Sequence, residues 1–129
     1  MLARYRISRG KPKPGERLPD GVRQDTRKHT SHCLRPTAAV VGAFLAGPMD
    51  AAAWRRFADA YRAVVEERFR VDRGPFDRLA ELASEHDVYL GCSCPTQKQP
   101  RVDRCHTYLA LQFMAQRYPE LEVVLPTSG

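Results

Sequence analysis

The sequence has no apolar run long enough to cross a lipid bilayer. Its longest candidate in 129 residues, Thr37 to Ala46, falls well short of the roughly 20 residues that a membrane-spanning helix needs. The first residues, Met1 to Arg4, contain no apolar segment of the kind found in secretory signal peptides. We therefore expect a cytoplasmic protein with no membrane partner.

The sequence is also poor in cysteine and has no Cys-x-x-Cys pair. Four cysteines in a chain of this size do not make a disulfide framework, and Cys92 and Cys94 are too close along the chain for an ordinary bridge. In a cytosolic protein a cluster of thiols more often indicates metal binding, catalysis or simple burial. The cysteines are therefore expected to be reduced.

Positive charge is abundant but unevenly distributed. The net charge of the chain is +6. Residues 1–36 carry ten Lys or Arg against three acids, a balance of +7, whereas residues 37–129 carry eleven against twelve, a balance of −1. This asymmetry suggests a phosphate-bearing or polyanionic partner for the first segment, although a long basic loop can equally be a solvated surface.

Hydrophobic periodicity and turn residues predict a single α/β domain over residues 1–129. We predict strands over residues 2–8, 88–94 and 121–125, a long basic loop over residues 9–35, and helices over residues 37–45, 51–69, 76–86 and 103–118. The helix over 37–45 is expected to be buried, and the last helix to be capped by Asp103. Right-handed crossovers between the strands give a small, Rossmann-like parallel sheet of about three strands, with packed helices in two or three layers. The nearly all-apolar strand 88–94 is expected at its centre.

Three of the four cysteines and one of the four histidines lie in the stretch from Cys92 to His106. Residues two apart on a strand share a face, so Cys92 and Cys94 are expected to point to the same side. Cys105 and His106 open the last helix, which begins near the carboxyl end of the preceding strand, so Cys105 can lie within several ångströms of Cys94. This is the place where an α/β domain usually binds its ligand.

The cations of this stretch predict a site for a phosphorylated ligand, either a nucleotide or a nucleic acid. Free backbone N–H groups at the helix start can bind a phosphate together with nearby Lys and Arg. Residues from the first strand and from the 9–35 loop are expected to close over it. The predicted ligand-binding residues are Arg6, Arg9, Cys92, Cys94, Lys98, Arg101 and Arg104.

A second interpretation is a cysteine-dependent enzyme of unknown reaction. Cys105 lies at a helix N-terminus beside His106, a position that stabilises a thiolate, so Cys105 would be the nucleophile and His106 the base. Burial of Cys105 beside Leu109 would instead raise the pKa of its thiol. Cys92 and Cys94 can also be plain core residues, since cysteine is among the most buried residue types.

A third interpretation is a zinc-binding interaction module. Its ligands would be Cys92, Cys94, Cys105 and His106, or His29, His32 and Cys33 reaching across from the basic loop. Against it, neighbouring Cys105 and His106 cannot easily face one ion from a helix. We therefore predict no cofactor and leave zinc as an alternative.

Three short motifs occur in an order that is also found in a bacterial family. They are Tyr5-Arg6-Ile7-Ser8-Arg9-Gly10, Trp54-x-x-Phe57-x-x-x-Tyr61-Arg62, and Leu90-Gly91-Cys92 with Arg104-Cys105-His106. Together they resemble the domain of unknown function 488, the YeaO-like proteins, over most of the chain. The resemblance implies a compact α/β domain with its site at the Cys-His element, and it supplies no established reaction. Thr107 stands where the family has an arginine, so that role would pass to Arg104 or Arg101, or be lost.

Overall fold

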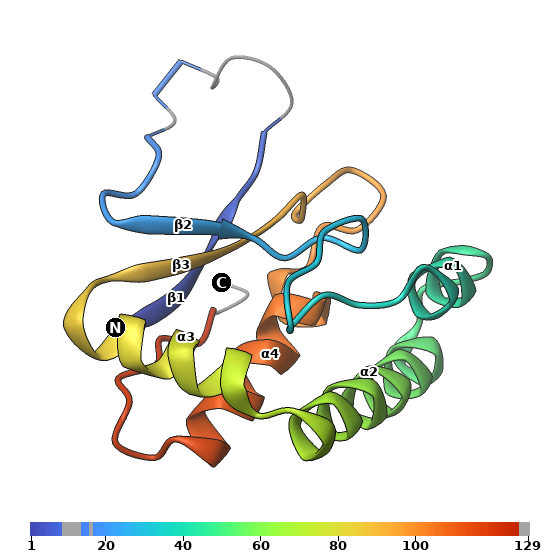
Figure 1. Ribbon diagram of the computed structural model, residues 1–129. Coiled ribbons are helices and arrows are strands. Elements are labelled where there is room, and N and C mark those ends of the chain that lie inside the picture. Colours follow the sequence, from blue (N-terminus) through green and yellow to red (C-terminus); the bar gives the residue numbers. More distant parts are fainter. Residues whose placement is uncertain (9–13, 16, 127–129) are drawn as a thin grey trace.

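A parallel sheet of three strands is the frame of the structure (Figure 1), a computed structural model that describes residues 1–8, 14–15 and 17–126. The elements in chain order are β1 (Leu2–Arg6), β2 (Val22–Asp25), α1 (Ala38–Leu45), α2 (Ala51–Val71), α3 (Gly74–Glu85), β3 (Val88–Cys92), the short 3-10 turn η1 (Val102–Arg104) and α4 (His106–Arg117). The predicted α/β class with a small parallel sheet is confirmed. None of the helices in these ranges is long and apolar enough to cross a membrane.

The central strand is β3, as predicted. It pairs with β1 on one side and with β2 on the other, and its Val88 and Leu90 are fully buried. Arg6 pairs with Cys92, and Asp25 pairs with Gly91. The carboxyl ends of the three strands therefore meet at one edge of the sheet, where the segments that follow them come together.

The third strand is not the one predicted over residues 121–125. That segment forms only an isolated bridge, between Val123 and Leu2. The third strand is β2, so the prediction of one long loop over residues 9–35 was wrong. The β2 sequence, Val-Arg-Gln-Asp, has little apolar content to mark a strand, and its backbone instead pairs with β3 at the edge of the sheet. In the described part of the chain no helix separates β1 from β2, whereas α1, α2 and α3 lie between β2 and β3.

The helices α2, α3 and α4 lie on one side of the sheet (Figure 1), so the described part has two layers. The Asp50 carboxylate accepts a hydrogen bond from the Ala53 N–H and caps α2. The apolar faces of these helices pack with β3 into one core. Helix α1 differs from the prediction, because it packs mainly on α2 and only its Phe44 is buried.

The last helix begins three residues later than the expected cap. Asp103 lies in η1 and its carboxylate accepts hydrogen bonds from the Arg101 guanidinium, with an Nη2–Oδ2 distance of 2.7 Å. Because this ion pair occupies its side chain, Asp103 does not cap α4. Cys105 is the N-cap residue instead, and its side chain makes no capping hydrogen bond. The Cys105 thiol is thereby placed directly before a twelve-residue helix.

Candidate functional site

Three sulfur atoms meet at the carboxyl edge of the sheet. The Sγ atoms of Cys92, Cys94 and Cys105 all lie within 4.8 Å of one another, and those of Cys92 and Cys94 are 4.0 Å apart. Cys92 ends β3 and Cys105 precedes α4, so the strand and the helix bring together thiols that twelve residues separate along the chain. The expected proximity of Cys94 and Cys105 is confirmed, and three sulfur donors form a set that suits a thiophilic metal ion.

The loop between β3 and α4 is fixed by two polar side chains that the sequence did not single out. The buried Gln99 amide donates to the Cys94 Sγ at 3.4 Å and to the Arg104 carbonyl at 3.0 Å, and its Oε1 accepts from the Arg101 N–H at 2.9 Å. From β1, the Arg4 guanidinium donates to the Cys94 carbonyl and to the Thr107 hydroxyl. The position of the Cys94 thiol is therefore determined from two sides.

A chain of polar contacts leads from Cys105 back into the sheet. The buried Thr26 hydroxyl donates to the Gly91 carbonyl at 2.9 Å, so its lone pair accepts from the His106 Nε2–H at 2.8 Å. The other ring nitrogen, Nδ1, is then unprotonated and lies 3.8 Å from the Cys105 Sγ. This arrangement holds an imidazole in the tautomer that can take a proton from the thiol.

The three thiols have unequal acidity. The pKa of Cys105 lies well below its usual value, first because the thiols of Cys92 and Cys94 donate to its sulfur, and further because of His106, while burial opposes the shift. The pKa of Cys92 is raised by the same hydrogen bonding, and that of Cys94 is raised to about 11. Cys105 is therefore the most acidic of the three thiols, and it lies at the positive end of α4.

A cavity of about 410 Å³ opens beside the cluster, between the segment after β2, the loop after β3 and the helices α1 and α2. One part of its lining is cationic and another part is apolar. The cations are Arg27, Lys28, Lys98 and Arg104, and the larger apolar side chains are Val41, Phe44, Leu45 and Phe57. No described Asp or Glu lines it. The cavity thus offers positive charge and apolar surface to the same ligand.

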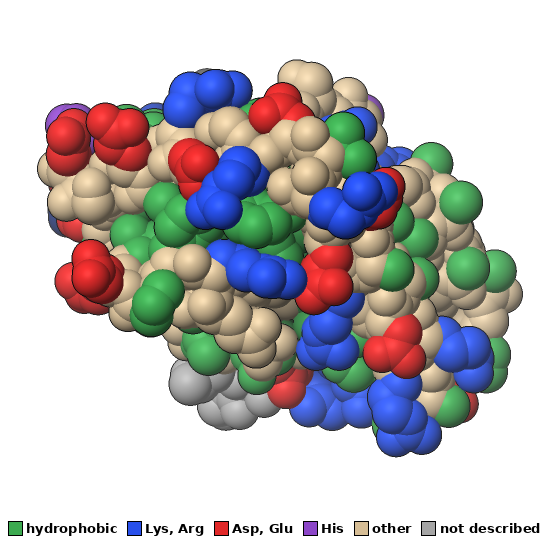
Figure 2. Space-filling model, turned by 60° about the horizontal axis from the view of Figure 1, so that its bottom comes forward, with side chains coloured by type: hydrophobic (Ala, Val, Ile, Leu, Met, Phe, Trp, Pro, Cys, Tyr) green, Lys and Arg blue, Asp and Glu red, His purple; other side chains and the backbone are tan. Residues whose placement is uncertain are grey.

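The helical face of the molecule is different. Figure 2 shows an apolar area on it, surrounded by both cationic and acidic side chains. A second hollow, between α2 and α4, is lined by Glu66 and Glu67 as well as by Arg70, Arg73 and Arg117. Two of these cations lie over the Phe69 ring, Arg73 at 4.9 Å and Arg117 at 5.2 Å. Because acidic and basic side chains line it together, this hollow lacks the uniformly cationic charge of the cavity beside the thiol cluster.

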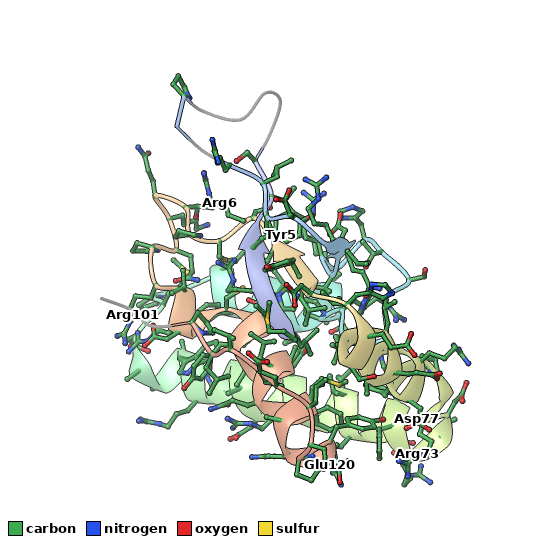
Figure 3. All side chains as sticks on the ribbon, turned by 90° about the vertical axis from the view of Figure 1, so that its left-hand side faces the viewer. Tyr5, Arg6, Arg73, Asp77, Arg101 and Glu120 are labelled. Carbon is green, nitrogen blue, oxygen red and sulfur yellow. The ribbon has the colours of Figure 1, made fainter. Side chains whose placement is uncertain are left out.

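The structure separates the predicted site residues into two groups. The members that line the cavity are Cys92, Cys94, Lys98, Arg104, Cys105 and His106. Arg6 and Arg101, both labelled in Figure 3, are not among the residues that line it: Arg6 donates to the Pro95 carbonyl at 3.0 Å, and Arg101 pairs with Asp103. Arg9 lies outside the described residues.

The basic segment after β2 contributes to the site as well. Thr26, which the sequence did not reveal, holds His106, and the side chains that follow line the cavity as far as His29. The other metal candidates of this segment, His32 and Cys33, are not part of the thiol cluster within the described ranges. The sequence Asp-Thr-Arg-Lys at residues 25–28 points to the site only when residues 22–25 are recognised as a strand. The motif then lies at the carboxyl end of that strand, where ligand sites form.

The family model DUF488-N3a, described as the active DUF488-N3 subclade, matches residues 8–118. The chain belongs to the DUF488 family. The match includes the thiol cluster, His106 and Thr26, and it confirms the resemblance drawn from the short motifs. No curated protein and no solved structure matches the chain significantly.

Proposed function

We propose that the cavity binds a phosphorylated ligand, a nucleotide either free or at the end of a nucleic acid, and that Cys105 acts on it as a thiolate nucleophile. One observation carries the proposal. The Cys105–His106–Thr26 chain opens into a cavity whose charged lining residues are all cations among the described side chains. The description of the matched subclade as active also supports a catalytic role.

The lining of the cavity supports a ligand with two chemically different parts. Lys28, Lys98 and Arg104 can neutralise a phosphate, and no described carboxylate of the lining repels it. Phe44 and Phe57 offer apolar surface of the kind on which a nucleobase packs. The volume of about 410 Å³ lies within the roughly 300–1,000 Å³ of typical small-molecule sites.

The chemistry follows from the contacts of Cys105. His106 Nδ1 takes the thiol proton, and the Thr26 hydroxyl accepts a hydrogen bond from Nε2–H of the resulting imidazolium. The Cys105 sulfur then forms a bond to the electrophilic atom of the ligand, while the bond to the leaving group breaks. The leaving group departs with the proton from His106, so charge and atoms balance over the step.

Binding is tested by calorimetry with a panel of nucleoside mono-, di- and triphosphates at low salt. The matched variants are Lys98→Ala, which removes a cation of the cavity, and Arg55→Ala, which removes an exposed cation of α2 outside it. We expect Lys98→Ala to weaken binding about 3- to 10-fold and Arg55→Ala to leave it unchanged. Absence of binding by the whole panel, or equal losses in both variants, overturns the ligand assignment.

The nucleophile is tested separately by the ultraviolet absorbance of the thiolate as a function of pH. We expect the wild-type protein and Cys33→Ser to show one thiolate at about neutral pH and Cys105→Ser to show none. Cys33 is the matched control, because burial raises its pKa to about 11. If Cys105→Ser keeps the wild-type absorbance, the assignment of Cys105 is wrong.

A further inference from the structure

We propose that the Sγ atoms of Cys92, Cys94 and Cys105 bind one thiophilic metal ion of the zinc class, with a fourth position left for a water molecule or a ligand group. This inference goes beyond the nucleotide site and rests on a different observation, the convergence of three sulfur atoms from a strand end and a helix start.

The spacing of the sulfur atoms fits a single ion. In an equilateral triangle the distance from centre to corner is the edge divided by √3, so edges of 4.0 and 4.8 Å correspond to about 2.3 and 2.8 Å. A zinc–sulfur bond is about 2.3 Å long. An ion at the centre therefore needs sulfur shifts of no more than about half an ångström, which side-chain rotation supplies without movement of β3 or α4.

Polar side chains next to the cluster make the kind of contacts that orient metal ligands. Gln99 is 7% exposed, and its side chain directs an N–H to the Cys94 Sγ at 3.4 Å. Such hydrogen bonds orient ligands and tune the metal. Three thiolates and a divalent cation carry a net charge of −1, which the Arg4 guanidinium at the Cys94 carbonyl helps to balance.

The chemical class of the ion follows from the donors. Thiolate ligands select zinc or monovalent copper over magnesium and calcium, which prefer oxygen. Among the described residues no fourth His, Cys, Asp or Glu joins the three sulfur atoms. The three cysteines themselves line the cavity, so a fourth ligand can reach the ion from there. Three protein ligands and an open position are the pattern of catalytic zinc sites, whereas structural sites are closed by four.

A bound ion would compete with the proposed reaction for the same sulfur. Cys105 is both the proposed nucleophile and one of the three ligands. Zinc is therefore expected to slow the alkylation of Cys105 by iodoacetamide and to leave that of Cys33, which lies outside the cluster, unchanged.

The test is the zinc content of protein that has been stripped with a chelator, desalted and dialysed against buffered zinc. We expect about one ion per chain in the wild type and in Cys33→Ser, and affinity lower by more than about 10-fold in Cys94→Ser. Cobalt should give the visible absorption of a thiolate-bound tetrahedral ion in the first two proteins only. Cys92→Ser is a second variant, and circular dichroism shows whether each one folds.

Wild-type protein that retains no zinc, or a folded Cys94→Ser and a folded Cys92→Ser that both retain it as tightly as wild type, overturns the metal site. The two proposals fail separately. Zinc binding without nucleotide binding removes the nucleotide site and supports the metal site. Nucleotide binding by a chain that takes up no zinc removes only the metal site.

Discussion

Thr26 determines how His106 faces Cys105. Its hydroxyl is fully buried and makes hydrogen bonds with the Gly91 carbonyl and with His106 Nε2. A valine has nearly the same shape but leaves the buried Nε2–H without an acceptor. Removing one partner of a buried hydrogen bond costs the desolvation of the other, about 1–3 kcal/mol.

We therefore expect Thr26→Val to lower the free energy of unfolding by about 1–3 kcal/mol, measured by urea denaturation. Thr26→Ser keeps the hydroxyl and is the control, with an expected loss below about 1.5 kcal/mol from the missing methyl group. Equal stability of Thr26→Val and the wild type would contradict the assigned hydrogen bonds.

His32 is held in its neutral form by its neighbours. Its Nδ1 accepts the Leu34 N–H at 3.1 Å, so its Nε2–H donates to the Gln24 Oε1 at 2.7 Å. Burial, and after it electrostatic repulsion from His106 whenever that ring is protonated, lowers the pKa of His32 to about 4. A proton on Nδ1 would break the hydrogen bond from Leu34.

The free energy of unfolding should consequently decrease as the pH is lowered below the ordinary histidine pKa. Between about pH 6.5 and pH 4 the unfolded state binds this proton and the folded state does not, so acid favours unfolding. The full shift corresponds to about 3 kcal/mol, which partial exposure reduces to about 2 kcal/mol. Urea denaturation across this range should show a flatter curve for His32→Gln than for the wild type. The same slope in both proteins would show that another group is responsible.

At the level of elements, the sequence predicted what local patterns determine. Helix α2 and strand β3 were recovered because a long three-four repeat and an apolar run are local signals. Strand β2 was missed, because its four polar-rich residues become a strand only through pairing with β3. The predicted start of α4 was wrong because the carboxylate of Asp103, the expected capping residue, pairs with the Arg101 guanidinium.

The features of the site also divide into those that local sequence patterns predict and those that depend on tertiary structure. The closeness of Cys94 and Cys105 was predictable, because it needs only a strand end and a helix start. The roles of Thr26 and Gln99 were not, since each makes its contacts through tertiary structure: Thr26 with residues 65 and 80 positions away, and Gln99 within a loop whose shape no local pattern specifies.

Two glycines in different elements give a matched test of the packing. A Cβ on Gly91 in β3 would lie 2.7 Å from both Ile7 Cδ1 and Tyr5 Cε1, whereas one on Gly42 in α1 meets nothing within 4 Å. We expect Gly91→Ala to cost about 1–3 kcal/mol by overpacking. Gly42→Ala should raise the free energy of unfolding by up to about 1 kcal/mol through helix propensity. Thermal denaturation of both variants checks this, and a loss in Gly42→Ala as large as that in Gly91→Ala would contradict the described packing.

At the scale of the whole molecule, the charge asymmetry of the sequence is partly explained by the fold. Part of the basic excess of residues 1–36 reaches the cavity through Arg27 and Lys28, and Lys98 and Arg104 come from the other half of the chain. Arg27 is paired with Asp25 at 2.8 Å. Its field is therefore weakened, and Lys28, Lys98 and Arg104 are the main sources of positive potential in the cavity.

Nucleotide binding should therefore depend on salt. Ions screen charges at solvent-open sites over about 10 Å at 0.1 M and about 3 Å at 1 M. We expect calorimetry to show affinity falling as salt rises, with a shallower dependence in Lys98→Ala than in the wild type. Affinity that is constant from low to high salt would contradict electrostatic recognition of phosphate.

The most direct test of the central claim is the rate at which each cysteine of metal-free protein reacts with iodoacetamide, resolved by peptide mass and measured with and without nucleotide. At about pH 6 we predict that Cys105 reacts faster than Cys33, whose thiol stays protonated, and that saturating nucleotide slows Cys105 alone. A Cys105 that reacts no faster than Cys33, or whose rate is the same with nucleotide bound, would contradict a reactive thiolate in a nucleotide pocket.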